Sequence, residues 1–164
     1  MRIAFLFFIF LLSSCSYEKK NYSLLDVKRI YVDKSERKMF LLDDLDGTVA
    51  EYDIRLGTNP IGHKIKEGDG KTPEGKYVIT WHNPQSKYYK SIRISYPNSD
   101  DRKRAAALGV SPGGDIMVHG VDFASYKHHR QKKDWTAGCI AVDNQDMDEI
   151  FYNVKDGTEI TIVP

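Results

Sequence analysis

Short apolar runs alternate with polar turns along most of the chain, a pattern typical of β-strands. Val27–Asp33 mixes β-branched and aromatic residues with charges, Lys38–Leu42 is apolar, and Thr48–Leu56 carries alternating apolar residues. Asp43–Gly47, a stretch of turn-forming residues, separates the second run from the third. The three runs therefore predict an antiparallel meander.

The remainder of the chain continues this pattern and adds two helical segments. Further strands are predicted at Lys76–Trp81, Tyr89–Tyr96, Ile116–His119, Ile140–Val142 and Thr158–Val163. One helix is predicted at Asp100–Leu108, capped by Asn98 or Ser99 and stopped by Gly109. A second is predicted at Gln145–Val154, capped by Asp143 or Asn144. Seven or eight strands with two short helices predict a mostly-β fold in a single domain.

The segment Gly57–Gly75 interrupts the strand pattern with five glycines and two prolines. A loop of this length without structure of its own is usually functional or disordered. It holds no G-x-x-x-x-G-K-[ST] phosphate-binding motif. We expect Lys71, Thr72 and Glu74 to be structural residues that hold this loop near a site.

The first residues indicate export. Arg2 is followed by an apolar run, Ile3–Leu12, and then by two serines and Cys15. This is the pattern of a secretory signal, and the run is shorter than the roughly 20 residues that span a bilayer. Leu12–Cys15 also resembles the lipobox of bacterial lipoproteins, and this implies cleavage before Cys15 and lipidation of its thiol. The expected organisation is a signal peptide at 1–14, a tether at 15–22 and a folded domain at 23–164.

The charge balance and the cysteine content limit the classes of function that the chain can have. The chain has 24 Lys and Arg against 23 Asp and Glu, and this balance argues against a nucleic-acid partner. Exported proteins usually pair their cysteines. If Cys15 is acylated, Cys139 is left as a lone thiol, and this favours a chemical role for it.

Cys139 and His119 form a candidate pair for nucleophilic catalysis. His119 ends a short predicted strand, and Gly138–Cys139 opens the next apolar run. An unperturbed thiol has a pKa of about 8.5, so a neighbouring imidazole is needed to make it a nucleophile at neutral pH. Gly138 lacks a side chain, and the N–H groups of Gly138 and Cys139 are candidates for holding an oxyanion. This arrangement favours acyl transfer through a thioester, although a buried lone cysteine is also a common apolar filler.

The same residues resemble the catalytic motif of the YkuD-type (ErfK-like) L,D-transpeptidases. His119 is followed by Gly120, and the sixteen residues Gly120–Trp135 separate His119 from Thr136-Ala-Gly-Cys-Ile-Ala141. Gly68–Tyr77 is similar to the family's Thr-Pro-Glu-Gly-x-Tyr segment, and Ser111–Asp115 also matches. The resemblance extends from about Val27 to Val163.

This resemblance implies a β-sandwich or mixed-sheet domain with no metal or cofactor that acts on peptidoglycan stem peptides. Cys139 would be the nucleophile, His119 the base, Gly120 the residue whose carbonyl orients the histidine, and Gly138 part of the oxyanion hole. A neighbouring stem, a wall-linked lipoprotein or water would accept the acyl group. The lipid anchor at Cys15 would place the domain on the periplasmic face of a bacterial membrane, and Ser16 favours the outer membrane.

Two departures from the motif leave alternatives open. Ala137 stands where the family has histidine, and Ala141 stands where it has arginine. These changes make an L,D-hydrolase or amidase of the same fold the first alternative to a transpeptidase. A non-catalytic wall-binding lipoprotein is the second, and a metal hydrolase is a remote third.

Several residues near the motif are further candidates for substrate contact. Thr136 belongs to the motif, and Trp135 and Tyr126 either wall a pocket or simply pack. Arg130 lies in a basic run that is either a solvated loop or a lid that attracts carboxylates. The five histidines show no H-E-x-x-H or paired metal-binding spacing.

Overall fold

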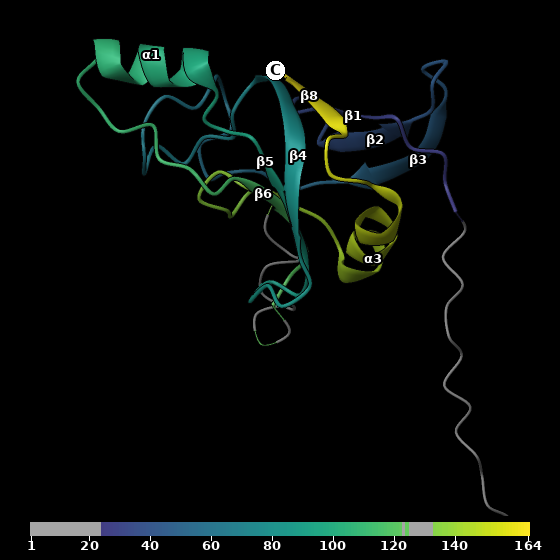
Figure 1. Ribbon diagram of the computed structural model, residues 1–164. Coiled ribbons are helices and arrows are strands. Elements are labelled where there is room, and N and C mark those ends of the chain that lie inside the picture. The colour runs from purple at the N-terminus through teal and green to yellow at the C-terminus, as the bar shows by residue number, and fades with distance from the viewer. Residues whose placement is uncertain (1–23, 123, 125–132) are drawn as a thin grey trace, which may run out of the picture.

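The computed structural model describes residues 24–122, 124 and 133–164. Over these residues the chain forms an eight-stranded mixed sheet and two α-helices (Figure 1). The strands are β1 (Arg29–Asp33), β2 (Lys38–Leu42), β3 (Thr48–Asp53), β4 (Gly75–Asn83), β5 (Ser91–Ile94), β6 (Met117–His119), β7 (Ile140–Ala141) and β8 (Glu159–Val163). The helices are α1 (Ser99–Ala107) and α3 (Asn144–Asn153).

The strands follow the order β3-β2-β1-β8-β4-β5-β6-β7. The first three form the predicted antiparallel meander, and β8 joins them by pairing in parallel with β1 and antiparallel with β4. Strands β4, β5 and β6 are antiparallel, whereas β7 is parallel to β6. Strand β4 therefore connects the meander to the β5–β6–β7 part of the sheet (Figure 1).

The hydrophobic core lies on one face of the sheet, which carries the buried residues of each strand. In β1, β2 and β8 every second residue is buried, as expected for strands with one covered face. Val118, Ile140 and Ile92 extend this buried face to β5, β6 and β7. Met147 and Ile150 of α3 are fully buried in the same cluster. The sequence prediction of a mostly-β fold with two short helices is confirmed over the described residues.

Both helices lie within one residue of their predicted bounds. Asn98 caps α1 by accepting hydrogen bonds from the N–H groups of Asp100 and Asp101, and the Asp101 side chain accepts from the Asn98 N–H. This reciprocal pair is a capping box. Gly109, with a φ of 66°, follows the end of α1 as predicted. Asp143 occupies the N-cap position of α3.

The structure differs from the sequence prediction at several strand ends, and two of these differences bear on the site. The strand predicted at Tyr89–Tyr96 begins only at Ser91, because Tyr89 has a left-handed backbone with a φ of 79°. The strand predicted at Thr48–Leu56 ends at Asp53. Beyond it, Arg55 and Gly57 form isolated bridges with Ala141 and Thr136. These bridges bring the end of the meander against the Cys139 segment.

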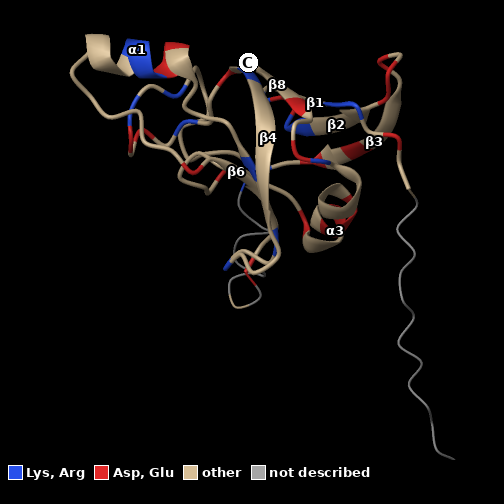
Figure 2. Cartoon of the chain, in the orientation of Figure 1, with Lys and Arg blue, Asp and Glu red and all other residues tan. Residues whose placement is uncertain are grey.

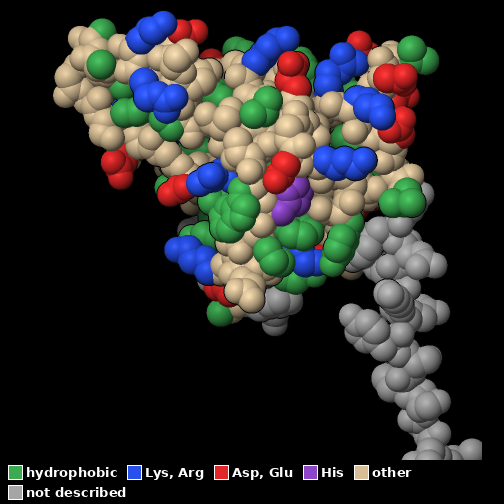
Figure 3. Space-filling view, in the orientation of Figure 1, with side chains coloured by type: hydrophobic (Ala, Val, Ile, Leu, Met, Phe, Trp, Pro, Cys, Tyr) green, Lys and Arg blue, Asp and Glu red, His purple; other side chains and the backbone are tan. Residues whose placement is uncertain are grey.

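The surface mixes both signs of charge. Lys and Arg lie close to Asp and Glu on the strands, helices and loops (Figure 2), and the face drawn in Figure 3 shows no region of one sign alone. Within the described residues, neither helix is long and apolar enough to cross a bilayer. The predicted signal peptide, the tether and Cys15 lie outside the described residues.

Candidate active site

The pairing of β6 with β7 brings Cys139 and His119 to one face of the sheet. Val118 lies opposite Ile140, and His119 lies opposite Ala141. Val118 and Ile140 are fully buried in the core. Because side chains alternate along a strand, Cys139 and His119 point to the other face. There they both line a cavity of about 540 Å³.

His119 is held in one orientation by its own neighbour in sequence. Its Nδ1 lies 2.6 Å from the Gly120 carbonyl oxygen. A carbonyl can only accept a hydrogen bond, so Nδ1 carries the proton and Nε2 is the basic nitrogen of the neutral ring. The Tyr88 ring stacks on the imidazole with centroids 4.7 Å apart, and Trp135 meets it edge-on at 5.7 Å. The ring is thus fixed in the tautomer that a general base requires.

Glycine at position 120 allows the close packing that holds this carbonyl in place. A Cβ at this position would lie 2.5 Å from Oδ1 of Asn144 and 3.2 Å from the Tyr88 carbonyl oxygen. The Asn144 amide accepts from the Val121 N–H and donates to the Val121 carbonyl oxygen. The start of α3 therefore holds the backbone that orients His119, and this contact was not predicted from the sequence.

Cys139 is a half-buried thiol surrounded by backbone groups. Its Sγ donates to the Asp115 carbonyl oxygen at 3.6 Å. Burial raises the pKa of the thiol, and this outweighs the lowering of the pKa by the Met117 N–H and by the charge of Lys64. At neutral pH the resting thiol is therefore protonated, and it needs a base to become a nucleophile.

Thr136 and Gly138 shape the turn that presents Cys139. The Thr136 hydroxyl donates to the Cys139 carbonyl oxygen at 2.7 Å and accepts from the Gly138 N–H at 3.1 Å. Thr136 is buried and does not line the cavity. The structure thus differs from the prediction that Thr136 contacts substrate and that the Gly138 N–H points at an oxyanion. Both groups are already used within the turn.

Gly138 is required for close packing and for its backbone conformation. Its φ is 137°, and a Cβ would lie 2.6 Å from the Lys71 carbonyl oxygen and 3.3 Å from the side chain of Ile116. We therefore expect Gly138→Ala to lower the free energy of unfolding by about 3 kcal/mol, measured by denaturant unfolding. Gly109→Ala is the matched control, since its φ is also positive but no atom lies within 4 Å of the added Cβ. A loss at Gly138 no larger than the loss at Gly109 would contradict the packing argument.

The glycine-rich loop lies directly against this turn and is ordered by its own side chains. The Thr72 hydroxyl is buried and accepts from the Gly57 N–H. Asp69 accepts hydrogen bonds from Lys64 Nζ and from the N–H groups of residues 65, 66 and 71. Burial alone would raise the pKa of Asp69, but these hydrogen bonds outweigh it and hold the pKa at about 2. Thr72 is structural, as expected from the sequence.

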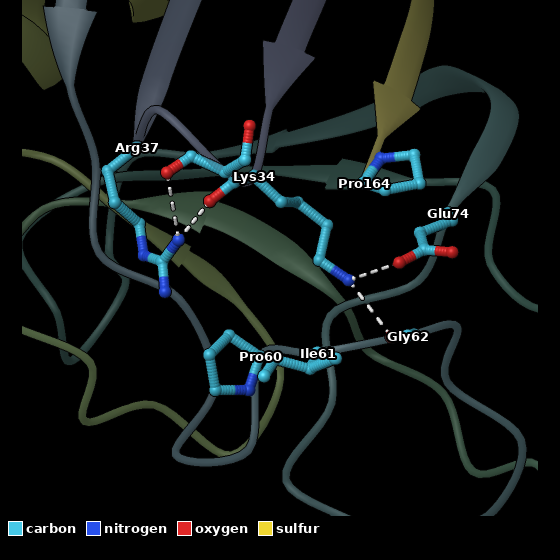
Figure 4. A pocket seen from close by; sticks show the side chains of 8 residues that line it. Lys34, Arg37, Pro60, Ile61, Gly62, Glu74 and Pro164 are labelled. Carbon is cyan, nitrogen blue, oxygen red and sulfur yellow. Dashed lines mark hydrogen bonds and ion pairs between the residues drawn. The ribbon is translucent and has the colours of Figure 1, made fainter.

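Lys34 fastens the loop to the turn between β1 and β2. Its buried ammonium donates to the carbonyl oxygens of Gly62 and Thr72 and to Glu74 Oε1, the last at 2.8 Å. Figure 4 shows this contact at a cavity of about 190 Å³. Burial lowers the pKa of Lys34, and the Glu74 carboxylate partly offsets this effect. This cavity contains neither Cys139 nor His119, and its polar groups fix the loop.

The other predicted contact residues have different outcomes. Trp135 packs edge-on against the His119 ring but does not itself line the Cys139 cavity. Tyr126 and Arg130 lie outside the described residues. Most residues that line the Cys139 cavity were not predicted from the sequence, and these are Trp81, Asn83, Ser86, Lys87, Tyr88, Ser91, Asp115 and Met117. Most of them come from β4, β5 and the turn between these strands.

The two departures from the motif have different surroundings. Ala137 is exposed, whereas Ala141 is fully buried and exchanges backbone hydrogen bonds with Arg55 at 2.8 Å. A long charged side chain at position 141 would therefore need space that this structure fills. Residue 141 is packed where β7 pairs with the segment that follows β3.

Comparison with known proteins identifies the family. The YkuD family model, described as the L,D-transpeptidase catalytic domain, matches residues 27–162. The chain therefore belongs to the YkuD family of L,D-transpeptidase catalytic domains, as the sequence resemblance predicted. This family acts on peptidoglycan peptides.

Relatives and solved structures agree with this assignment. YafK of Escherichia coli (strain K12), a protein named as an L,D-transpeptidase, is 38% identical over 105 residues, which is 63% of this chain and 36% of YafK. The helical cell shape determining protein Pgp2 of Campylobacter jejuni has a TM-score of 0.66 at 25% identity, over 83% of this chain and 47% of Pgp2. Bd1075 of Bdellovibrio bacteriovorus has a TM-score of 0.60 at 24% identity, over 82% of this chain and 47% of Bd1075, and it shares the fold. The chain thus spans about a third to a half of the length of these proteins.

Proposed function

We propose that this chain is a cysteine acyltransferase that cleaves an L,D peptide bond in a peptidoglycan stem peptide. The observation that carries the proposal is the shared cavity of Cys139 and His119, in which the Gly120 carbonyl fixes the imidazole with Nε2 as its base. Membership of the L,D-transpeptidase family supports the choice of substrate.

In the first half-reaction, His119 Nε2 takes the proton of the Cys139 thiol, and the thiolate attacks the carbonyl carbon of the L,D bond. A C–S bond forms, and negative charge develops on the carbonyl oxygen. We assign the stabilisation of this oxygen to the Cys139 N–H, because the Gly138 N–H is used by Thr136. The tetrahedral intermediate then collapses to a thioester, and the departing amine takes the proton from His119.

In the second half-reaction, an amine of another stem attacks the thioester carbonyl and gives up a proton to His119. The C–S bond breaks and the Cys139 thiol is restored. If water attacks in place of the amine, the reaction is a hydrolysis. This alternative stays open because the buried Ala141 replaces the arginine of the family motif.

Product analysis separates these outcomes. The purified chain is incubated with defined tetrapeptide muropeptides, and the products are resolved by chromatography and mass spectrometry. New tetrapeptide–tetrapeptide cross-links are the expected result. Released peptides without cross-links would replace the transferase proposal with a hydrolase. Unchanged muropeptides would favour a non-catalytic wall-binding protein.

We also propose that Cys15 carries a lipid anchor that holds the domain at the periplasmic face of a bacterial membrane, with the outer membrane favoured. The support is the lipobox-like Leu12–Cys15 segment. We expect the full chain to fractionate with membranes and Cys15→Ser to be found in the soluble fraction, because a protein without acyl chains loses stable anchoring. Equal membrane association of the two chains would contradict the anchor.

A further inference from the structure

The sheet register places an arginine on the same face as the catalytic pair. Trp81 of β4 lies opposite Arg93 of β5, and Arg93 lies opposite Met117 of β6. The β6–β7 register places Met117 beside Cys139. Neighbouring strands are about 4.8 Å apart, so the backbones of Arg93 and Cys139, two strands apart, are separated by roughly 10 Å. Because Ile92 is fully buried in the core, the alternation of β5 directs Arg93 away from the core.

Arg93 lines a second cavity that meets the Cys139 cavity. The second cavity has a volume of about 390 Å³. Its polar lining includes Thr80, Arg93, Ser95, Arg102 and Asp115. Asp115 also lines the first cavity, and its carbonyl oxygen contacts the Cys139 thiol. A peptide bound at Cys139 can therefore extend into the second cavity by passing Asp115.

The Arg93 side chain is positioned but remains accessible. Its Nε donates to the Thr80 hydroxyl at 3.3 Å, and its guanidinium lies 5.7 Å from the centre of the Trp81 ring. The side chain is 43% exposed. The closest acidic contact is Asp115 Oδ1 at 3.8 Å from Nη1, which is too long for a hydrogen bond. The guanidinium fork thus faces the cavity, where a carboxylate could pair with it through two hydrogen bonds.

We propose that the Arg93 cavity is a subsite for a free carboxylate of the peptide substrate. This inference rests on the proposed function for the identity of the peptide. A separation of roughly 10 Å corresponds to about three extended residues, and a long arginine side chain shortens it. The carboxylate therefore belongs to a group close to the reacting bond. It is either the carboxylate of the D-residue that leaves or the side-chain carboxylate of the residue that Cys139 acylates.

Within the Cys139 cavity itself, Lys87 is the competing cation, and it lies on the side of Tyr88. It lies in the turn between β4 and β5, away from the second cavity. A substrate carboxylate bound by Lys87 would approach His119 from the stacked Tyr88, whereas one bound by Arg93 would pass Asp115. Substitution of each residue distinguishes the two paths.

The test measures peptide binding in a Cys139→Ala background, so that it does not depend on any acylation. Calorimetry gives the Kd of a stem tetrapeptide and of two analogues, each with one of the two carboxylates amidated. Adding Arg93→Ala should weaken binding of the unmodified tetrapeptide about ten- to a hundredfold. Arg93→Lys should lose less. Lys76→Ala, which removes an exposed charge on the neighbouring strand β4, should bind as the background does.

The analogues decide which carboxylate is bound. Amidation of the recognised carboxylate should weaken binding to the background variant by the same factor as Arg93→Ala, and should have no further effect once Arg93 is absent. An equal Kd with and without Arg93 would overturn the subsite. The subsite would also be overturned if Arg93→Ala weakened binding equally for the tetrapeptide and for both amidated analogues. It would likewise be overturned if the effect of amidation disappeared in Lys87→Ala and not in Arg93→Ala. Absence of tetrapeptide binding to the background variant also counts against the subsite, whereas absence of turnover in the wild-type chain counts only against the proposed function.

Discussion

Cys139→Ala removes all transfer and hydrolysis of muropeptides while the domain stays folded. The expected loss of turnover is about 10⁴-fold or more, because the sulfur forms the bond that defines the intermediate. Stability should change by no more than about 1 kcal/mol, since the Sγ makes only weak hydrogen bonds, to the Asp115 carbonyl oxygen and with the Met117 N–H. Chromatography of the products and thermal unfolding of the same preparation provide the two measurements.

Retained turnover in folded Cys139→Ala would refute the thiol as nucleophile. If this variant unfolds, Cys139→Ser keeps a hydrogen-bond donor toward Asp115 and replaces it in the test. The serine hydroxyl is a much weaker nucleophile at neutral pH than a thiol that a base can deprotonate. Its turnover should also be close to background.

His119→Gln lowers the rate of acyl-enzyme formation at neutral pH by about 10²–10⁴-fold. The glutamine amide can still donate to the Gly120 carbonyl, so the variant removes the base more than it disturbs the fold. The deficit should shrink as the pH rises. Burial raises the pKa of the Cys139 thiol, so without a base the thiolate appears only in the alkaline range, where solvent hydroxide removes the proton.

Rapid-mixing mass spectrometry of the acylation rate against pH tests this expectation. His82→Gln is the matched control, since His82 of β4 bonds Asp156 and the Val154 carbonyl and does not line the Cys139 cavity. Its acylation rate should equal that of the wild-type chain across the pH range. A constant deficit of His119→Gln at every pH would mean that His119 positions substrate without taking the proton.

The sequence was sufficient to predict the main elements because each depends on local patterns. Alternation identified the strands of the meander, and the capping residue Asn98 and the stop residue Gly109 located α1. Cys139 and His119 were identified by a motif whose two halves lie on neighbouring strands. The sixteen residues that separate His119 from Thr136 lie in the connection between β6 and β7.

The rest of the site depends on register, which local patterns do not contain. Trp81 and Arg93 are residue types that occur on many half-exposed strands, so the sequence does not mark them as site residues. Only the pairing of β4, β5 and β6 places them in line with Cys139. Tyr88 lies in a turn, and its stacking on His119 has no signature in the sequence. Gly138 was predicted to help hold an oxyanion, but its N–H bonds Thr136 and the Lys71 carbonyl occupies the space that its missing side chain leaves.

The proposed reaction requires that a stem peptide acylate Cys139. Intact-mass measurement of the wild-type chain mixed briefly with a tetrapeptide and quenched in acid tests it most directly, followed by peptide mapping of the adduct. We expect a mass increase equal to the acyl part of the stem without its leaving D-residue, carried by the peptide that contains Cys139. An adduct on another residue, or product formation without any covalent adduct under single-turnover conditions, would contradict it.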